Sequence, residues 1–112
     1  TPLFVSHYFG KILNIHPSLL PKFPGLNTHQ RAIDASEKVH GVSVHFVTKE
    51  LDGGPLICQE SVIIDNLDTK ETLSMKVLKK EHVIYPKVIH WYTQKRLNLI
   101  DDKTATLDGK II

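Results

Sequence analysis

The stretch Ile12-Leu13-Asn14-Ile15-His16-Pro17 carries the strongest indication of the fold. The segment before His16 is apolar except for Asn14, a pattern typical of a strand that is buried on both faces of a parallel sheet. Pro17 ends the strand, because proline lacks the amide hydrogen that a sheet needs. A buried parallel strand needs neighbours on both sides, and parallel neighbours are joined through crossover helices. We therefore expect this chain to be the C-terminal half of an α/β domain.

The sequence that follows predicts two further strands joined as a hairpin. Residues 17–25 hold several prolines and a glycine, so they are expected to form an irregular loop. Residues 41–48 alternate partly between apolar and polar side chains, and residues 56–64 form a second apolar segment, so both are predicted strands. Leu51-Asp52-Gly53-Gly54-Pro55 lies between them and has the composition of a tight turn.

Short elements are expected near both ends of the chain. Helical spacing of apolar residues predicts short helices over residues 3–9 and 28–36, the second with Thr28 as its N-cap. Residues 97–112 are expected to form an edge hairpin that turns at Asp108-Gly109, a favourable two-residue turn.

A long helix is predicted between these regions. It begins at a sequence typical of a capping box, in which Asp68 accepts amide hydrogen bonds and Glu71 reaches back, and it runs to about Gln94. Pro86 lies inside it and removes one backbone hydrogen bond, so we expect a bend near His82.

Composition places limits on the function. The chain has 112 residues and a formal net charge of +2, which gives no general electrostatic case for binding nucleic acid or an acidic membrane. No apolar run approaches the roughly 20 residues that a membrane helix needs. Cys58 is the single cysteine, which excludes an internal disulfide and a multi-cysteine metal cage and fits a reducing compartment, so we expect the protein in the cytoplasm. The chain starts at Thr1 without an initiator methionine or a signal peptide, and we expect it to be a piece of something longer.

Asn14 and His16 form the first candidate site. Side chains two residues apart on a strand point to the same face, and His16 lies at the strand's carboxyl end, where open α/β sheets bind ligands. The alternative is a histidine that only bonds to nearby backbone groups. Asp52 completes a set of amide, imidazole and carboxylate that could handle protons, although alone it fits an ordinary turn residue. Gly53 and Gly54 beside it permit close approach of a flat ligand.

Glu81 is unusual on physical grounds. A helical wheel places the following residues in one apolar stripe of the long helix: Val77, Leu78, Tyr85, Val88, Ile89 and Tyr92. Glu81 falls inside that stripe, where a carboxylate needs a partner or hydrogen-bond donors. It is either half of a structural ion pair, a residue at an interface, or a ligand-binding carboxylate, for example for ribose hydroxyls.

Metal and phosphate motifs are absent from the sequence. None of the seven histidines has zinc-type spacing, so we expect no metal cofactor. The basic pairs Lys79-Lys80 and Lys95-Arg96 lack interleaved aromatic residues and fit a solvated surface. No glycine-rich phosphate loop is present, so another segment must bind any phosphate of the substrate.

The sequence resembles the folate-dependent formyltransferases. The resemblance rests on four runs in the expected order and covers nearly the whole chain, through Glu81-His82 and Leu107-Asp108-Gly109. The four runs are Asn14-Ile15-His16-Pro17-Ser18-Leu19-Leu20-Pro21, Pro24-Gly25-Leu26, His40-Gly41-Val42-Ser43-Val44-His45-Phe46-Val47 and Leu51-Asp52-Gly53-Gly54-Pro55. It implies an α/β fold that is the C-terminal half of an open mixed, Rossmann-like sheet, with one long helix and a C-terminal hairpin. Residues 1–112 would then be the catalytic and folate-binding half, and an N-terminal nucleotide-binding half with the phosphate loop would be a necessary partner.

The resemblance also implies roles for residues. Asn14, His16 and Asp52 match the family's catalytic trio, and Asn14 also contacts the formyl group of 10-formyltetrahydrofolate. The turn that includes Leu51, Asp52 and Gly53 matches the loop that holds the pterin ring through backbone groups. Pro17 and Glu81 match positions that contact glycinamide ribonucleotide.

The implied activity is formyl transfer from 10-formyltetrahydrofolate to the amine of glycinamide ribonucleotide, in de novo purine biosynthesis. A protonated His16 and the amide of Asn14 would stabilise the oxyanion that develops when the amine attacks. One alternative is a formyltetrahydrofolate hydrolase that uses the same trio. A second is a methionyl-tRNA formyltransferase, whose additional RNA-binding domain and basic surface are absent here. A third is a non-catalytic module that binds folate or a partner.

Overall fold

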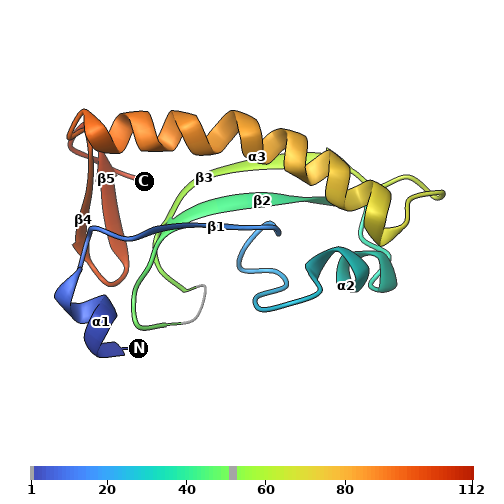
Figure 1. The fold of residues 1–112 in the computed structure, drawn as a ribbon, viewed down its shortest axis with the longest axis horizontal. Coiled ribbons are helices and arrows are strands. Elements are labelled where there is room, and N and C mark those ends of the chain that lie inside the picture. Colours follow the sequence, from blue (N-terminus) through green and yellow to red (C-terminus); the bar gives the residue numbers. More distant parts are fainter. Residues whose placement is uncertain (1, 51–52) are drawn as a thin grey trace.

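A computed structural model describes residues 2–50 and 53–112 of the chain, which form a mixed α/β structure (Figure 1). The elements follow in the order α1 (Pro2–His7), β1 (Leu13–His16), α2 (Thr28–Asp34), β2 (Val39–Phe46), β3 (Leu56–Ile63), α3 (Lys70–Thr93), β4 (Leu97–Asp101), β5 (Thr104–Leu107) and β6 (Lys110–Ile111). The predicted α/β class is therefore confirmed, and so are the three predicted helices, including the long one. Within the described residues, no helix has both the length and the apolar character needed to cross a membrane.

The first sheet has the strand order β1-β2-β3, and both pairs are antiparallel. The predicted hairpin between residues 41–48 and 56–64 is confirmed as β2 and β3, with a register shift at Val44/His45. On the side of β2 the predicted parallel pairing of β1 is wrong, because Leu13 lies opposite Phe46 and His16 opposite Ser43 in an antiparallel ladder. Among the described residues β1 pairs on this one side only, and Asn14 is exposed. A parallel neighbour on the other side of β1 stays a prediction.

The core lies between this sheet and α3, which runs along one face of it (Figure 1). Strand β2 contributes Val42, Val44 and Phe46, all fully buried. The buried residues of α3 are Leu73, Val77, Ile84 and Val88. The predicted stripe is right for Val77 and Val88 and wrong for Leu78 and Ile89, each 38% exposed. The buried face is rotated toward Leu73 and Ile84. Apolar residues lie on several sides of this helix, and contact with the sheet determines which of them are buried.

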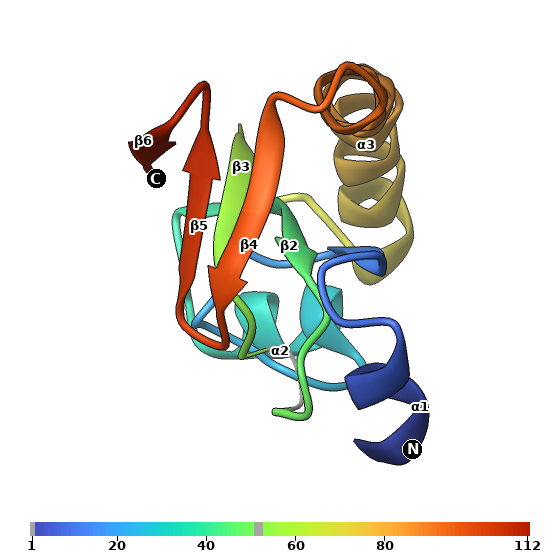
Figure 2. The ribbon, with the colours of Figure 1, turned by 90° about the vertical axis from the view of Figure 1, so that its left-hand side faces the viewer.

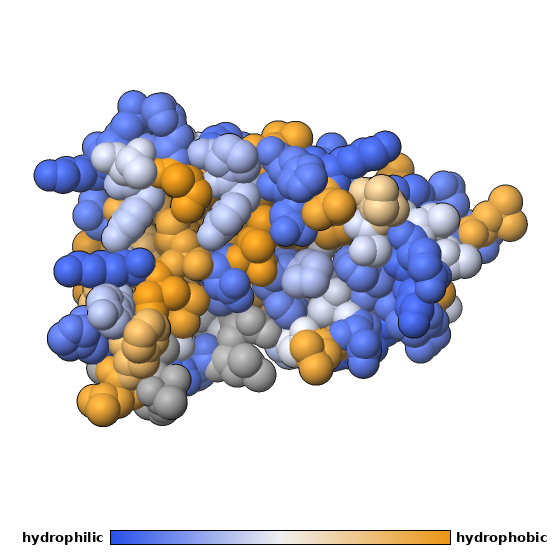
Figure 3. Space-filling view, viewed as in Figure 1, coloured by the Kyte–Doolittle hydropathy of each residue, from blue (hydrophilic) through white to orange (hydrophobic). Residues whose placement is uncertain are grey.

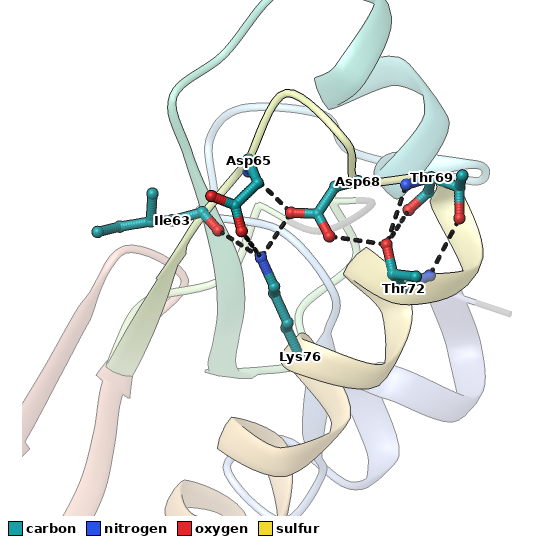
Figure 4. Close-up of polar contacts among 6 residues, drawn as sticks. All are labelled: Ile63, Asp65, Asp68, Thr69, Thr72 and Lys76. Atoms are coloured by element: carbon teal, nitrogen blue, oxygen red, sulfur yellow. Dashed lines mark hydrogen bonds and ion pairs between the residues drawn. The ribbon is translucent and has the colours of Figure 1, made fainter.

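The start of α3 is held by a polar cluster that Figure 4 shows. Thr69 is the N-cap, and its side chain and that of Thr72 each accept a hydrogen bond from the other's backbone amide. The predicted box is thus displaced by one residue from Asp68 and Glu71. Asp68 instead accepts a hydrogen bond from the Thr72 hydroxyl at 2.7 Å and an ion pair from Lys76 Nζ at 2.5 Å, and Lys76 Nζ also lies 3.0 Å from Asp65. These contacts lower the pKa of Asp68 to about 2, with the hydrogen bond from Lys76 as the largest cause.

The C-terminal strands form a second antiparallel sheet in the order β4-β5-β6, whose strands face the viewer in Figure 2. The turn at Asp108-Gly109 is confirmed, with φ values of 53° and 82°, but it joins β5 to the short β6. A second turn, at Asp102 and Lys103, joins β4 to β5 and was not predicted. The sheet closes one end of the core through Leu97 and Ala105.

Candidate active site

Asn14 and His16 lie on the same face of β1, as predicted from their spacing. They lie opposite His45 and Ser43 of β2, respectively. Their neighbour Ile15 pairs with Val44, which packs against α3, so Asn14 and His16 point to the side of the sheet away from that helix. Asn14 is exposed at the sheet edge, whereas His16 is only 6% exposed. The arrangement places an amide and an imidazole side by side along one edge.

The imidazole of His16 is held by the loop that follows it. Its Nε2 lies 2.9 Å from the carbonyl oxygen of Phe23. The alternative of a histidine bonded to nearby backbone is therefore correct as a description of this contact. It does not remove the catalytic interpretation, because an imidazole has a second ring nitrogen that can donate or accept a hydrogen bond.

A buried hydroxyl fastens the same loop to the sheet. Ser43 Oγ donates to the Ser18 carbonyl at 2.7 Å and accepts from the Leu20 amide at 3.1 Å. Gln59 Nε2 of β3 lies 2.9 Å from Ser43 Oγ and 2.9 Å from the Leu20 carbonyl. Neither Ser43 nor Gln59 had a role predicted from the sequence. The available signal was the polar residue Ser43 between two valines on a buried strand.

Pro17 is bound from α2 and β2. The Thr28 hydroxyl donates to the Pro17 carbonyl at 2.5 Å, and His40 also hydrogen-bonds the Pro17 backbone. Thr28 is therefore the first residue of α2 and not its N-cap, which is Asn27 with φ 57°. His29 Nδ1 lies 3.1 Å from His40 Nε2.

Burial and neighbouring imidazoles keep His29 and His40 neutral. Burial lowers the pKa of His29. Burial, followed by the charges of His29 and His16, lowers the pKa of His40 to about 4. The backbone around Pro17 therefore lies among neutral hydrogen-bonding groups at physiological pH.

The predicted folate loop is described in part. Leu51 and Asp52 lie outside the described residues, so the carboxylate of the trio has no position here. Gly53 is exposed, and its amide donates to the Glu50 carbonyl at 3.2 Å. A Cβ at Gly54 would lie 1.9 Å from the Phe46 carbonyl oxygen, so only glycine fits there. This close approach places Gly54 beside the end of β2, next to the start of β1.

Glu81 lies on α3, on the other side of the sheet from Asn14 and His16. It is half-buried at the margin of the buried stripe. In the described ranges 2–50 and 53–112, no hydrogen bond or ion pair joins its side chain to another residue. The structural ion pair considered from the sequence is therefore not found there.

A groove of about 670 Å³ lies between α2 and the start of α3, where residues 27–34 face Lys70, Glu71 and Ser74. The groove between α2 and α3 is not lined by Asn14, His16, Pro17 or Glu81. The site formed by Asn14 and His16 is instead an open sheet edge. Among residues 2–50 and 53–112, no cluster of three or more His, Cys, Asp or Glu side chains is arranged to hold a metal ion.

Comparison with known proteins identifies the fold's relatives. Phosphoribosylglycinamide formyltransferase of Escherichia coli is 51% identical over 110 residues, which cover 98% of this chain and 51% of that protein. The structure of phosphoribosylglycinamide formyltransferase from Coxiella burnetii has a TM-score of 0.93 and 54% identity, covering 100% of this chain and 52% of that one. A formyltetrahydrofolate deformylase from Pseudomonas syringae has a TM-score of 0.86 at 28% identity, covering 95% of this chain and 35% of that one.

The family follows from a match over most of the chain. The formyl transferase family model matches residues 1–89, which include β1, β2, β3 and most of α3. The chain spans about half the length of the bacterial relatives it matches. The resemblance seen in the sequence motifs is thus confirmed, and the chain belongs to the formyl transferase family.

Proposed function

We propose that this chain is the catalytic and folate-binding half of an enzyme that transfers a formyl group to glycinamide ribonucleotide in purine biosynthesis. The donor is 10-formyltetrahydrofolate, and we place the reaction in the cytoplasm. The observation that carries the proposal is the placement of Asn14 and His16 on one face at the open edge of β1. The similarity of nearly the whole chain to a protein named phosphoribosylglycinamide formyltransferase supports the choice of acceptor.

The chemistry needs donors at an oxygen that becomes negative. The substrate amine attacks the formyl carbon, a new carbon–nitrogen bond forms, and the carbonyl oxygen takes up the displaced electron pair. Asn14 and a protonated His16 donate hydrogen bonds to this oxyanion, where charge grows most between ground and transition state. The bond to folate N10 then breaks, and the proton lost by the amine is returned to N10, with water as a relay. No metal takes part in these steps.

Asp52 is assigned two roles in this proposal. As an anion near His16 it favours the imidazolium form. Together with Leu51 and Gly53 it also belongs to the loop that holds the pterin ring through backbone groups. The close approach of Gly54 to the Phe46 carbonyl supports this assignment, because Phe46 lies opposite Leu13, the neighbour of Asn14 on β1.

We assign the ribonucleotide to the edge of β1. Its amine lies at Asn14 and His16, its neighbouring atoms contact the backbone of Pro17, and its ribose hydroxyls are bound by Glu81 across the edge. The half-buried carboxylate of Glu81, which makes no hydrogen bond or ion pair within the described part of the chain, supports a role in ligand binding.

A second half of the same enzyme is proposed to cover this edge and to bind the substrate phosphate. Figure 3 shows apolar side chains gathered between α3 and α1, on the face where β1 lies. Leu3 and Phe4 of α1 are 82% and 56% exposed. An unpaired edge strand flanked by exposed apolar residues is typical of a surface that another segment covers.

The test joins these 112 residues to the half of the Escherichia coli relative that they do not match, a protein called the completed chain below. We expect it to formylate glycinamide ribonucleotide from 10-formyltetrahydrofolate, with His16→Ala and Asp52→Asn each lowering kcat by about 10²–10³. Activity that survives both substitutions would support a non-catalytic role for this chain.

The competing function is hydrolysis of formyltetrahydrofolate, which the similarity to the deformylase structure favours. The same trio would then activate water, and the products would be formate and tetrahydrofolate. Release of formate without formylated amine, measured in the completed chain with both substrates present, would select the hydrolase.

A further inference from the structure

The carbonyl of Phe23 determines which nitrogen of His16 carries a hydrogen. A carbonyl oxygen only accepts, so the contact of 2.9 Å from His16 Nε2 requires a hydrogen on Nε2. The neutral ring that makes this contact is then the Nε2–H form. Contacts that hold the Phe23 carbonyl in place therefore control the imidazole.

Phe23 adopts a backbone conformation that its own side chain disfavours. Its φ is 52°, in the left-handed region that a residue with a large side chain rarely occupies. Such a conformation persists only where the surrounding structure holds it. The neighbours must supply contacts that compensate for the strain.

Arg31 of α2 supplies these contacts. Its Nη1 donates to the Pro24 carbonyl at 2.6 Å and to the Leu26 carbonyl at 3.0 Å. Its guanidinium carbon lies 5.4 Å from the centre of the Phe23 ring, within range of a cation–π interaction. One side chain thus binds the backbone on the far side of Phe23 and the ring of Phe23 itself.

The helix that carries Arg31 is also held by contacts that do not involve Arg31. The Thr28 hydroxyl donates to the Pro17 carbonyl at 2.5 Å, and His29 lies 3.1 Å from His40 Nε2 on β2. The ring of Phe23 also meets the ring of His40 edge-on, with centroids 6.3 Å apart. The contacts of Arg31 therefore connect helix α2, which is held in place, through Phe23 to His16.

We infer that Arg31 is a positioning residue, which holds the left-handed conformation of Phe23 so that its carbonyl fixes the Nε2–H form of His16. This inference rests on the proposed function only in so far as His16 takes part in formyl transfer. Lysine does not replace arginine here, because an ammonium group cannot bridge two carbonyls and stack on a ring in the same way.

The experiment compares variants of the completed chain labelled with 15N-histidine. Long-range 15N–1H correlation spectra report which nitrogen of His16 carries hydrogen. The unmodified protein and Gln30→Ala are expected to show the Nε2–H form alone. Gln30 is the matched control, because it neighbours Arg31 on α2, and its side chain donates to Asp34 of the same helix at 2.8 Å and to no other residue that the structure describes.

Arg31→Ala is expected to show a mixture of both neutral forms and a kcat lowered up to about 100-fold, with KM unchanged, because catalysis is sensitive to misplacement of about 1 Å. Arg31→Lys is expected to change both readouts in the same direction to a smaller extent, and it replaces Arg31→Ala if that variant does not fold. A pure Nε2–H form in both Arg31 variants overturns the inference. So does an equal loss of kcat in Gln30→Ala.

The two proposals fail separately. A shift of the His16 spectrum in Arg31→Ala, in a completed chain that formylates nothing, supports the positioning inference and overturns the proposed function. Loss of formyl transfer in His16→Ala with an unchanged spectrum in Arg31→Ala does the reverse.

Discussion

The two faces of the β1–β2–β3 sheet differ in composition although they share the same strands. Toward α3, β2 presents Val42, Val44 and Phe46, which are fully buried in the core. Away from α3 the alternate residues Ser43 and His45 lie opposite the candidate pair on β1. A step of one residue along β2 thus moves from the apolar core to the polar site.

Because of this alternation, neighbouring residues of one strand have different roles: one packs in the core, and the next faces the candidate site. Burial of large apolar side chains supplies most of the stability of a small domain. The polar face contributes little of that kind and can instead present an amide and an imidazole to a ligand. The division predicts that neighbouring substitutions on one sheet have different consequences.

The largest effect is expected from Phe46→Ala on the apolar face. Phe46 is fully buried, and its ring lies edge-on to Tyr92 with centroids 6.5 Å apart. Its truncation is expected to lower the free energy of unfolding by about 3–5 kcal/mol, through lost burial and the cavity left behind. Urea denaturation of the completed chain measures this. A loss of activity with unchanged unfolding would contradict the division between the faces.

A change on the polar face tests the opposite case. Asn14→Ala is expected to lower kcat by about 10²–10³, because one oxyanion donor is removed. The free energy of unfolding should stay the same, since Asn14 is exposed. Asn98→Ala is the matched control, an exposed strand asparagine in the second sheet. Equal kcat in both variants would remove Asn14 from the mechanism.

The local patterns in the sequence predicted most elements but not the contacts between them. Strands β2 and β3, their hairpin and helix α3 follow from periodicity within each segment. The cap of α3 was misplaced by one residue, because Asp68 and Thr69 both suit an N-cap and the pairing of Asp68 with Lys76 decides between them. The antiparallel pairing of β1 depends on its partner, which its own residues do not specify.

The motifs predicted the residues of the candidate site but not the contacts that hold them in place. The common face of Asn14 and His16 follows from strand geometry. The bond from His16 to Phe23 depends on the path of the intervening loop, and the bond between Ser43 and Gln59 on the register of β2 and β3. Such tertiary contacts leave no periodic signal in a single sequence.

Ser43→Ala tests whether the polar face also contributes to stability, because this residue of the polar face is fully buried. Loss of its hydroxyl leaves the Ser18 carbonyl and the Leu20 amide without that partner, so unfolding should become easier by about 1–3 kcal/mol. Ser61→Ala, an exposed serine on β3, is the control, with an expected change within about 0.5 kcal/mol. Chemical denaturation compares the two variants, and equal effects would show that the loop is not held by Ser43.

The smallest effect is expected from Asp68→Asn, which lies at the start of α3 and on neither face of the sheet. The contacts with Lys76 and Thr72 lower the pKa of Asp68 from its ordinary 3.8 to about 2, so the folded state favours the ionised carboxylate. The stabilisation is therefore complete above about pH 4 and is lost as the pH falls toward 2. Asp68→Asn should lower Tm slightly at pH 7, and the difference from the unmodified completed chain should shrink at pH 3.

Asp102→Asn, whose carboxylate lies 4.0 Å from Lys49 Nζ, is the control for loss of a negative charge at an exposed carboxylate. A Tm difference for Asp68→Asn that does not change between pH 7 and pH 3 would show that the ion pair does not stabilise the helix start, and only the capping hydrogen bonds of Thr69 and Thr72 would remain as its support.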